Sequence, residues 1–195
     1  MKMRVQDDPS LRPRFIRMED LEAEIARAGG HREGRPDDRM PVHFEHNESL
    51  ALICTVHRDG GIDMVRWGEI PWDADEYEDL LTRAFNRFAA TLSGTEPERI
   101  ASASGLTYRV TLRDPHDSLL LLVGTTWRRW TVECRGELLA AVPAHDVLLI
   151  ADAGVPGARE ELAMLSAEYF RTSAHPLSER TMFRNQHHFG ESGRR

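Results

Sequence analysis

Two strongly apolar segments in the second half of the chain constrain its fold more than any other feature. They are Leu119–Val123 and Val147–Ile150. Both are bounded by aspartate, proline, histidine or glycine, which favour turns. Short apolar runs with such boundaries are typical of strands buried in a sheet. We therefore expect the run Asp114–Asp152 to supply sheet interior and corners, and not a reactive loop.

Length and composition indicate a cytoplasmic globular protein. The chain has 195 residues, 41% of them hydrophobic, and such a length buries about 70% of the surface that the unfolded chain exposes. No apolar run approaches the roughly 20 residues that span a bilayer, and the N-terminal residues lack the apolar stretch of a secretory signal. Cys54 and Cys134 have no CxxC spacing, so we expect reduced core thiols.

The charge balance makes some partners unfavourable. The formal net charge is −7, which argues against a protein that tracks nucleic-acid phosphates. The basic pairs Arg128-Arg129 and Arg194-Arg195 are too short to change that balance. We expect neither a nucleic-acid partner nor a membrane partner.

The first 41 residues are expected to form an arm, a short helix and a loop. Pro9 and Pro13 interrupt regular structure in residues 1–17. Residues 18–28 have helical spacing that ends at Gly29-Gly30, and residues 31–41 are polar. The sequence then predicts a single α+β domain over residues 42–190 and a disordered tail over residues 191–195.

Hairpin, helix and strand patterns follow in the remaining chain. Residues 50–67 predict a hairpin around Asp59-Gly60. Residues 73–92 predict an amphipathic helix capped by Asp73, with Tyr77 placed to pack on Trp72. A second amphipathic helix is expected between Pro156-Gly157 and His175-Pro176. Strands are expected at residues 106–112, 118–123, 138–142 and 146–151, with an edge strand near the C-terminus, whereas residues 125–134 fit either a strand or a short helix. The fold class is α+β, a largely antiparallel sheet with two long amphipathic helices packed on it.

Four motifs occur in order along the chain: Ala84–Asn86 on the first long helix after Trp67 and Trp72, Ser118–Leu122, Gly136–Leu149, and His175–Ser178. Together they resemble the YtpQ-like family of bacterial proteins, which carry a domain of unknown function. The resemblance covers about residues 50–185 and implies an α+β domain in a cytosolic bacterial protein. It implies no activity, cofactor or catalytic residue. The family pattern has a basic residue before Asp146, and His145 departs from it, so no arginine–carboxylate pair is carried over.

Histidine and aspartate in two turns are the strongest candidates for catalysis. His116 and Asp117 precede one apolar segment, and His145 and Asp146 precede the other. A carboxylate that orients a histidine is the basic unit of general-base catalysis. However, Ser118 and Ser104 lack the G-x-S-x-G context of a nucleophile, and turn-forming aspartates commonly bind local backbone amides. We favour that structural role for the four residues.

Other chemistry finds less support. His43 and His46, with His187-His188, are possible metal ligands, but their spacing does not place the rings on one face, and we expect no metal and no cofactor. P-loop, dinucleotide and H-E-x-x-H motifs are absent from the sequence. Trp127, Arg128, Arg129 and Trp130 could bind a partner by stacking, or the tryptophans could pack in the core. The acidic start of the first long helix, from Asp73 to Asp79, could contact a basic partner.

We therefore expect a non-catalytic cytosolic domain that binds a protein partner, as an adaptor, chaperone-like or regulatory module. One alternative is a toxin-neutralising immunity-type protein that covers a basic toxin with its acidic surface. The other is a hydrolase or metal-dependent enzyme that uses His116, Asp117, His145 and Asp146.

Overall fold

A computed structural model gives the fold of residues 4–32, 35–58, 60–70, 74–92, 95–123, 134–185 and 188–191. Their contacts gather in two compact units, unit 1 (Met1–Ser93) and unit 2 (Gly94–Arg195). Each unit combines an antiparallel sheet with helices, which confirms the expected α+β class. The two long helices lie on two different sheets rather than on one. The domain limits expected at residues 41 and 42 stay a prediction, because a grouping of contacts does not test independent folding.

The sheet of unit 1 is built around one long strand. This strand, β5 (Leu50–Arg58), pairs antiparallel with β1 (Arg12–Arg17), β4 (His43–Glu45) and β6 (Gly61–Met64). The expected hairpin is therefore confirmed as β5 and β6. Gly60 has φ 82°, the left-handed conformation that such a turn needs. Asp59 lies outside the described residues.

Strand β1 differs from the expected loose arm. Pro13 lies opposite Cys54 in the β1–β5 ladder, and β1 is at the edge of its sheet. An edge strand tolerates proline because one side of its backbone needs no ladder partner. Leu11 and Phe15 are buried and anchor the segment. Within the polar stretch expected to be a loop, the short strands β2 (His31–Arg32) and β3 (Arg35–Pro36) pair with each other.

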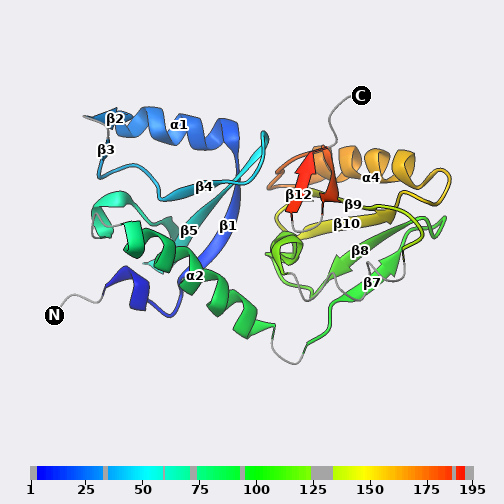
Figure 1. Cartoon of the computed structure of the whole chain (residues 1–195), viewed down its shortest axis with the longest axis horizontal. Helices are drawn as coiled ribbons and strands as arrows, with labels where there is room; N and C mark the ends of the chain where they lie inside the picture. The colour runs from blue at the N-terminus through cyan, green and yellow to red at the C-terminus, as the bar shows by residue number, and fades with distance from the viewer. Residues whose placement is uncertain are drawn as a thin grey trace. The chain divides into compact units, whose positions relative to one another are not determined.

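Helices pack on both faces of the unit 1 sheet (Figure 1). The helix α1 (Met18–Ala28) ends at Gly29, which has φ 98°, and this confirms the predicted end. It packs near Ala51 and Ile53, whereas α2 (Ala74–Thr91) packs on the side of Cys54. Cys54 is a free thiol buried in the core, as expected, and this burial raises its pKa to about 12. Two 3-10 turns, η1 (Val5–Asp7) and η2 (Trp67–Glu69), complete the described part of the unit. The predicted cap Asp73 and its neighbour Trp72 lie outside the described residues.

The sheet of unit 2 has the order β12-β11-β9-β10-β8-β7 in the described part of the chain. Its strands are β7 (Glu98–Ala101), β8 (Thr107–Thr111), β9 (Leu138–Ala144), β10 (Val147–Asp152), β11 (Thr181–Asn185) and β12 (His188–Glu191). Three of the four predicted strands are confirmed as β8, β9 and β10. The C-terminal segment forms a hairpin whose first strand pairs with β9, rather than a single edge strand.

The prediction of a strand over residues 118–123 is wrong. Of these residues, all but Val123 belong to the 3-10 helix η3 (Asp117–Leu122). Leu119, Leu120 and Leu121 are all buried there, and η3 packs against β8, β9 and β10. A continuous apolar run fits either a buried strand or a buried helix, because periodicity does not separate the two.

The predicted second amphipathic helix is confirmed as α4 (Ala158–Thr172). It lies along β9 and β10 (Figure 1), and buries Ala158 and Leu162 against Leu139 and Leu149. None of the helices in the described ranges combines the length and hydrophobicity that crossing a membrane requires.

Candidate functional site

A cleft of about 660 Å³ lies beside the C-terminal end of α4 in unit 2. Its lining comes from β7 and β8, from the turn before η3, from the β9–β10 turn and from the residues that end α4. Arg109 faces the α4 side of the sheet because it pairs with Leu149, which packs against that helix. The cleft thus forms where α4 ends and stops covering the sheet.

Asp117 is used inside the protein. Its side chain is 1% exposed. One carboxylate oxygen accepts a hydrogen bond from the Thr111 hydroxyl, and the other accepts one from the Leu112 backbone N–H at 2.9 Å. The Thr111 oxygen in turn accepts the Arg113 backbone N–H at 2.8 Å. Asp117 therefore closes the bend between β8 and η3, and its two bonds go to a hydroxyl and an amide.

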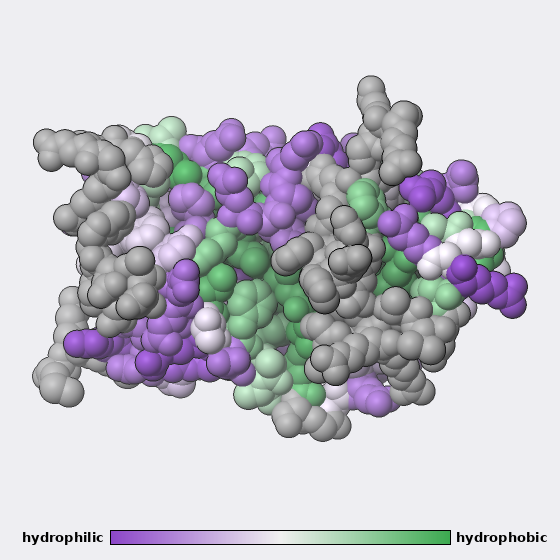
Figure 2. All heavy atoms as spheres, in the orientation of Figure 1, coloured by the Kyte–Doolittle hydropathy of each residue, from purple (hydrophilic) through white to green (hydrophobic). Residues whose placement is uncertain are grey.

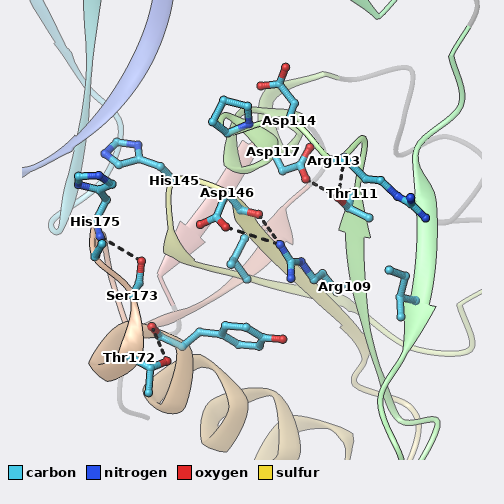
Figure 3. A pocket seen from close by; sticks show the side chains of 15 residues that line it. Arg109, Thr111, Arg113, Asp114, Asp117, His145, Asp146, Thr172, Ser173 and His175 are labelled. Carbon is cyan, nitrogen blue, oxygen red and sulfur yellow. Dashed lines mark hydrogen bonds and ion pairs between the residues drawn. The ribbon is translucent and has the colours of Figure 1, made fainter. Parts of the chain in front are cut away.

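Asp146 is held by an arginine from another strand. Arg109 donates from Nη2 to the Asp146 backbone oxygen at 3.0 Å and lies 3.7 Å from its carboxylate. The guanidinium also lies over the Tyr169 ring of α4, 5.9 Å from the ring centre. Figure 3 shows the Arg109 and Asp146 side chains pointing toward each other, and Asp117 pointing toward Thr111. The residue before Asp146 is His145 and not an arginine, and the arginine that pairs with the Asp146 carboxylate instead comes from β8.

Two imidazoles lie next to this pair. The rings of His145 and His175 are 6.3 Å apart in an edge-on arrangement and lie side by side in Figure 3. The His145 backbone N–H donates to the His175 carbonyl at 3.4 Å, and the His175 N–H donates to the Ser173 hydroxyl at 3.1 Å. These bonds join the β9–β10 turn to the segment that follows α4.

The structure brings together three of the four residues considered for catalysis. Asp117, His145 and Asp146 line the cleft, whereas His116 precedes η3 outside the lining. The two turns touch directly, since the Ser118 N–H donates to the His145 carbonyl at 3.0 Å. Ser118 itself is buried and its hydroxyl has no hydrogen-bond partner, so it is not placed to attack a substrate.

Sequence reasoning missed much of the cleft. Arg109, Tyr169 and His175 lie far from the two turns in sequence, and they join them only through strand pairing and helix packing. An arginine within a β-rich run was the one signal that could have marked Arg109. The predicted binding residues Trp127, Arg128, Arg129 and Trp130 lie outside the described residues, so their role stays a prediction.

A metal centre finds no support in the described part of the chain, where no group of three or more histidine, cysteine, aspartate or glutamate side chains could hold an ion. His43 lies in β4, and its Nδ1 is 3.0 Å from the Pro41 carbonyl. The His46 ring lies 5.4 Å from the Phe15 ring. The side chain of His188 and the whole of His187 are outside the description.

Comparison with known proteins adds one distant similarity. The chain is 30% identical over 82 residues to a UPF0354 protein of Staphylococcus saprophyticus, and the match covers 42% of this chain and 29% of that protein. The name of that relative states no activity. The chain matches no protein-family model and no solved structure. The similarity is thus consistent with a bacterial family of unknown function, as the four motifs indicated.

Proposed function

We propose that this chain is a non-catalytic domain that binds a protein partner through the cleft of unit 2. The observation that supports this most is how the candidate catalytic groups are bonded. Asp117 accepts from Thr111 and Leu112, and Asp146 pairs with Arg109. A catalytic histidine is commonly oriented by a carboxylate, and the bonds described for these two carboxylates go to other groups. The cytoplasmic location and the YtpQ-like assignment form part of the same proposal.

The residues of the cleft favour a protein as the ligand. Ile100 of β7 is 45% exposed and lines the cleft together with Tyr169 and Arg109. Tyrosine and arginine are enriched where protein interfaces carry most of their binding free energy. Exposed hydrophobic residues also occur elsewhere, and Figure 2 shows them among hydrophilic ones on the visible face. Exposure alone therefore does not mark Ile100 as a binding residue. Its position at the border of a cleft does.

A matched pair of substitutions tests the proposal. Ile62 of β6 in unit 1 is 42% exposed and serves as the control for Ile100. The full chain is cross-linked to its partners in cells of the organism that it comes from, and the captured protein is identified. The affinity of that protein for the natural chain and for both variants is then measured. We expect Ile100→Asp to weaken binding at least tenfold and Ile62→Asp to leave it unchanged. Equal binding by both variants would remove the cleft from the proposal.

The enzymatic alternative is tested separately with His145→Ala. We expect no hydrolytic activity that depends on this histidine. A hydrolysis rate that is measurable in the natural chain and lost in His145→Ala would replace the binding proposal with an enzymatic one.

A further inference from the structure

We infer that the cleft of unit 2 recognises an anionic oxygen group of its ligand, either a carboxylate or a phosphate. This inference rests on the proposed function, since it names the chemistry of what enters the same cleft. It starts from Arg109, whose side chain lines the cleft and is 33% exposed, while its Nη2 is bound to the Asp146 carbonyl.

Arg109 is held in place on one side by the Tyr169 ring and on another by Asp146. Its guanidinium is therefore positioned before a ligand arrives. A ligand oxygen that reaches the exposed part of the guanidinium would gain a charge-assisted hydrogen bond without ordering the arginine first.

Further donors line the same cleft. Arg113 stands at the rim with its side chain 81% exposed, 3.5 Å from Glu98. Ser173 accepts the His175 N–H, so its own hydroxyl proton remains available to a ligand. The imidazoles of His145 and His175 can each donate one proton when neutral and two when charged. Arginine, histidine and hydroxyl donors together match the oxygens of a carboxylate or phosphate.

The acidic residues of the cleft do not cancel these donors. Asp117 is buried and already accepts two hydrogen bonds. Asp146 faces Arg109 and fixes it. Asp114 is exposed, and one of its oxygens accepts the His116 N–H at 2.8 Å. Asp114 is therefore the exposed lining acid with no cationic partner among the described contacts, so it should repel an anion most directly, and its neutralisation should strengthen binding.

The test is an amide NMR titration of the full chain with inorganic phosphate and, separately, with acetate, both at constant ionic strength. We expect saturable shifts at the amides of residues 145–147 and 173–175. Arg109→Gln should weaken binding at least tenfold, exposed Arg113→Gln about threefold, and Asp114→Asn should strengthen it severalfold. Saturation by phosphate alone would identify a phosphate ligand, and saturation by acetate as well a carboxylate.

Arg99 offers the matched control. It lies on β7 opposite Val110, on the other face of the same sheet, with its guanidinium 5.7 Å from the Tyr108 ring centre. Arg99→Gln removes the same charge and should leave the titration unchanged. Linear shifts without saturation, equal weakening by Arg99→Gln, or weaker binding in Asp114→Asn would overturn the inference.

The two proposals fail in different ways. If Ile100→Asp loses the protein partner while Arg109→Gln keeps it, the partner-binding cleft stands and the anion preference falls. If Ile100→Asp binds the partner as tightly as the natural chain does, the proposed function is contradicted, whatever the result of the phosphate titration.

Discussion

The two His-Asp turns of unit 2 look alike in sequence and differ in the fold. His116-Asp117 and His145-Asp146 each precede an apolar run. Asp117 is 1% exposed and bound within its own bend, whereas the Asp146 side chain is 54% exposed and faces Arg109 across the cleft. Burial and the nearest donors, rather than the local pattern, decide whether such an aspartate shapes the fold or borders a site.

The apolar runs that follow the two turns should contribute equally to the free energy of unfolding. Any difference in stability between the turns would then come from the aspartates. Leu120 in η3 and Leu148 in β10 are both fully buried. We expect Leu120→Ala and Leu148→Ala each to lower the free energy of unfolding by about 4 kcal/mol. Urea denaturation measures this. A loss below about 1 kcal/mol for Leu120→Ala would mean that η3 is not part of the core.

The aspartates themselves should then separate. Asp117→Ala leaves the Thr111 hydroxyl and the Leu112 N–H without their acceptor, so we expect a loss of about 3 kcal/mol. Asp146→Ala should cost less than about 1 kcal/mol, because its carboxylate is exposed. Equal losses in urea denaturation would contradict the contrast between the turns.

A third aspartate, Asp152 at the end of β10, tests the same reasoning through pH. Its carboxylate accepts backbone N–H bonds from Arg135, Gly136 and Gly154 at 2.6, 2.9 and 2.8 Å. Partial burial acts to raise the pKa of Asp152, but these three donors outweigh it and lower the pKa below its ordinary 3.8. A lowered pKa adds stability that is fully present above the unfolded value and is lost as pH falls through the folded one.

We therefore expect Asp152→Asn to show a shallower loss of stability below about pH 4 than the natural chain. Urea denaturation at a series of acidic pH values measures the slope. Asp114→Asn, which removes the same charge from an exposed turn, is measured alongside as the charge control. An unchanged slope in Asp152→Asn would show that the three amide bonds do not stabilise the charged form.

The smallest effect is expected for the pair that borders the cleft. A double-mutant cycle on Arg109→Gln and Asp146→Asn should give a coupling below about 1 kcal/mol in unfolding free energy, as for exposed ion pairs. A coupling above about 2 kcal/mol would make this pair a structural contact like that of Asp117, and would remove the contrast between the turns.

Regular periodicity predicted most elements of the fold. The stripes of α1, α2 and α4 and the β5–β6 hairpin all follow from local spacing. The leucines of η3 did not, because a fully buried run has no polar face to show its period. Contacts between distant elements were not predicted: Tyr77 stacks on Trp67 and Phe44, with ring centres 4.9 and 4.4 Å away, whereas its expected contact with Trp72 involves a residue outside the described ranges and stays a prediction.

The candidate site was only partly predictable. Its two turns carry a local signal, and His145 and Asp146 were found by it. Arg109 and Tyr169 reach the cleft through the pairing of β8 with β10 and the packing of α4 on the sheet. Such long-range contacts leave no fixed spacing in the sequence, so the partner of Asp146 could only be found in three dimensions.

Hydrogen exchange of the full chain, alone and with the protein that it captures, tests the partner-binding cleft most directly. The account predicts slower exchange in β7, in residues 145–147 and in residues 169–175 when the partner is bound, and loss of that protection in Ile100→Asp. Protection confined to unit 1, with unchanged exchange around the cleft, would contradict it.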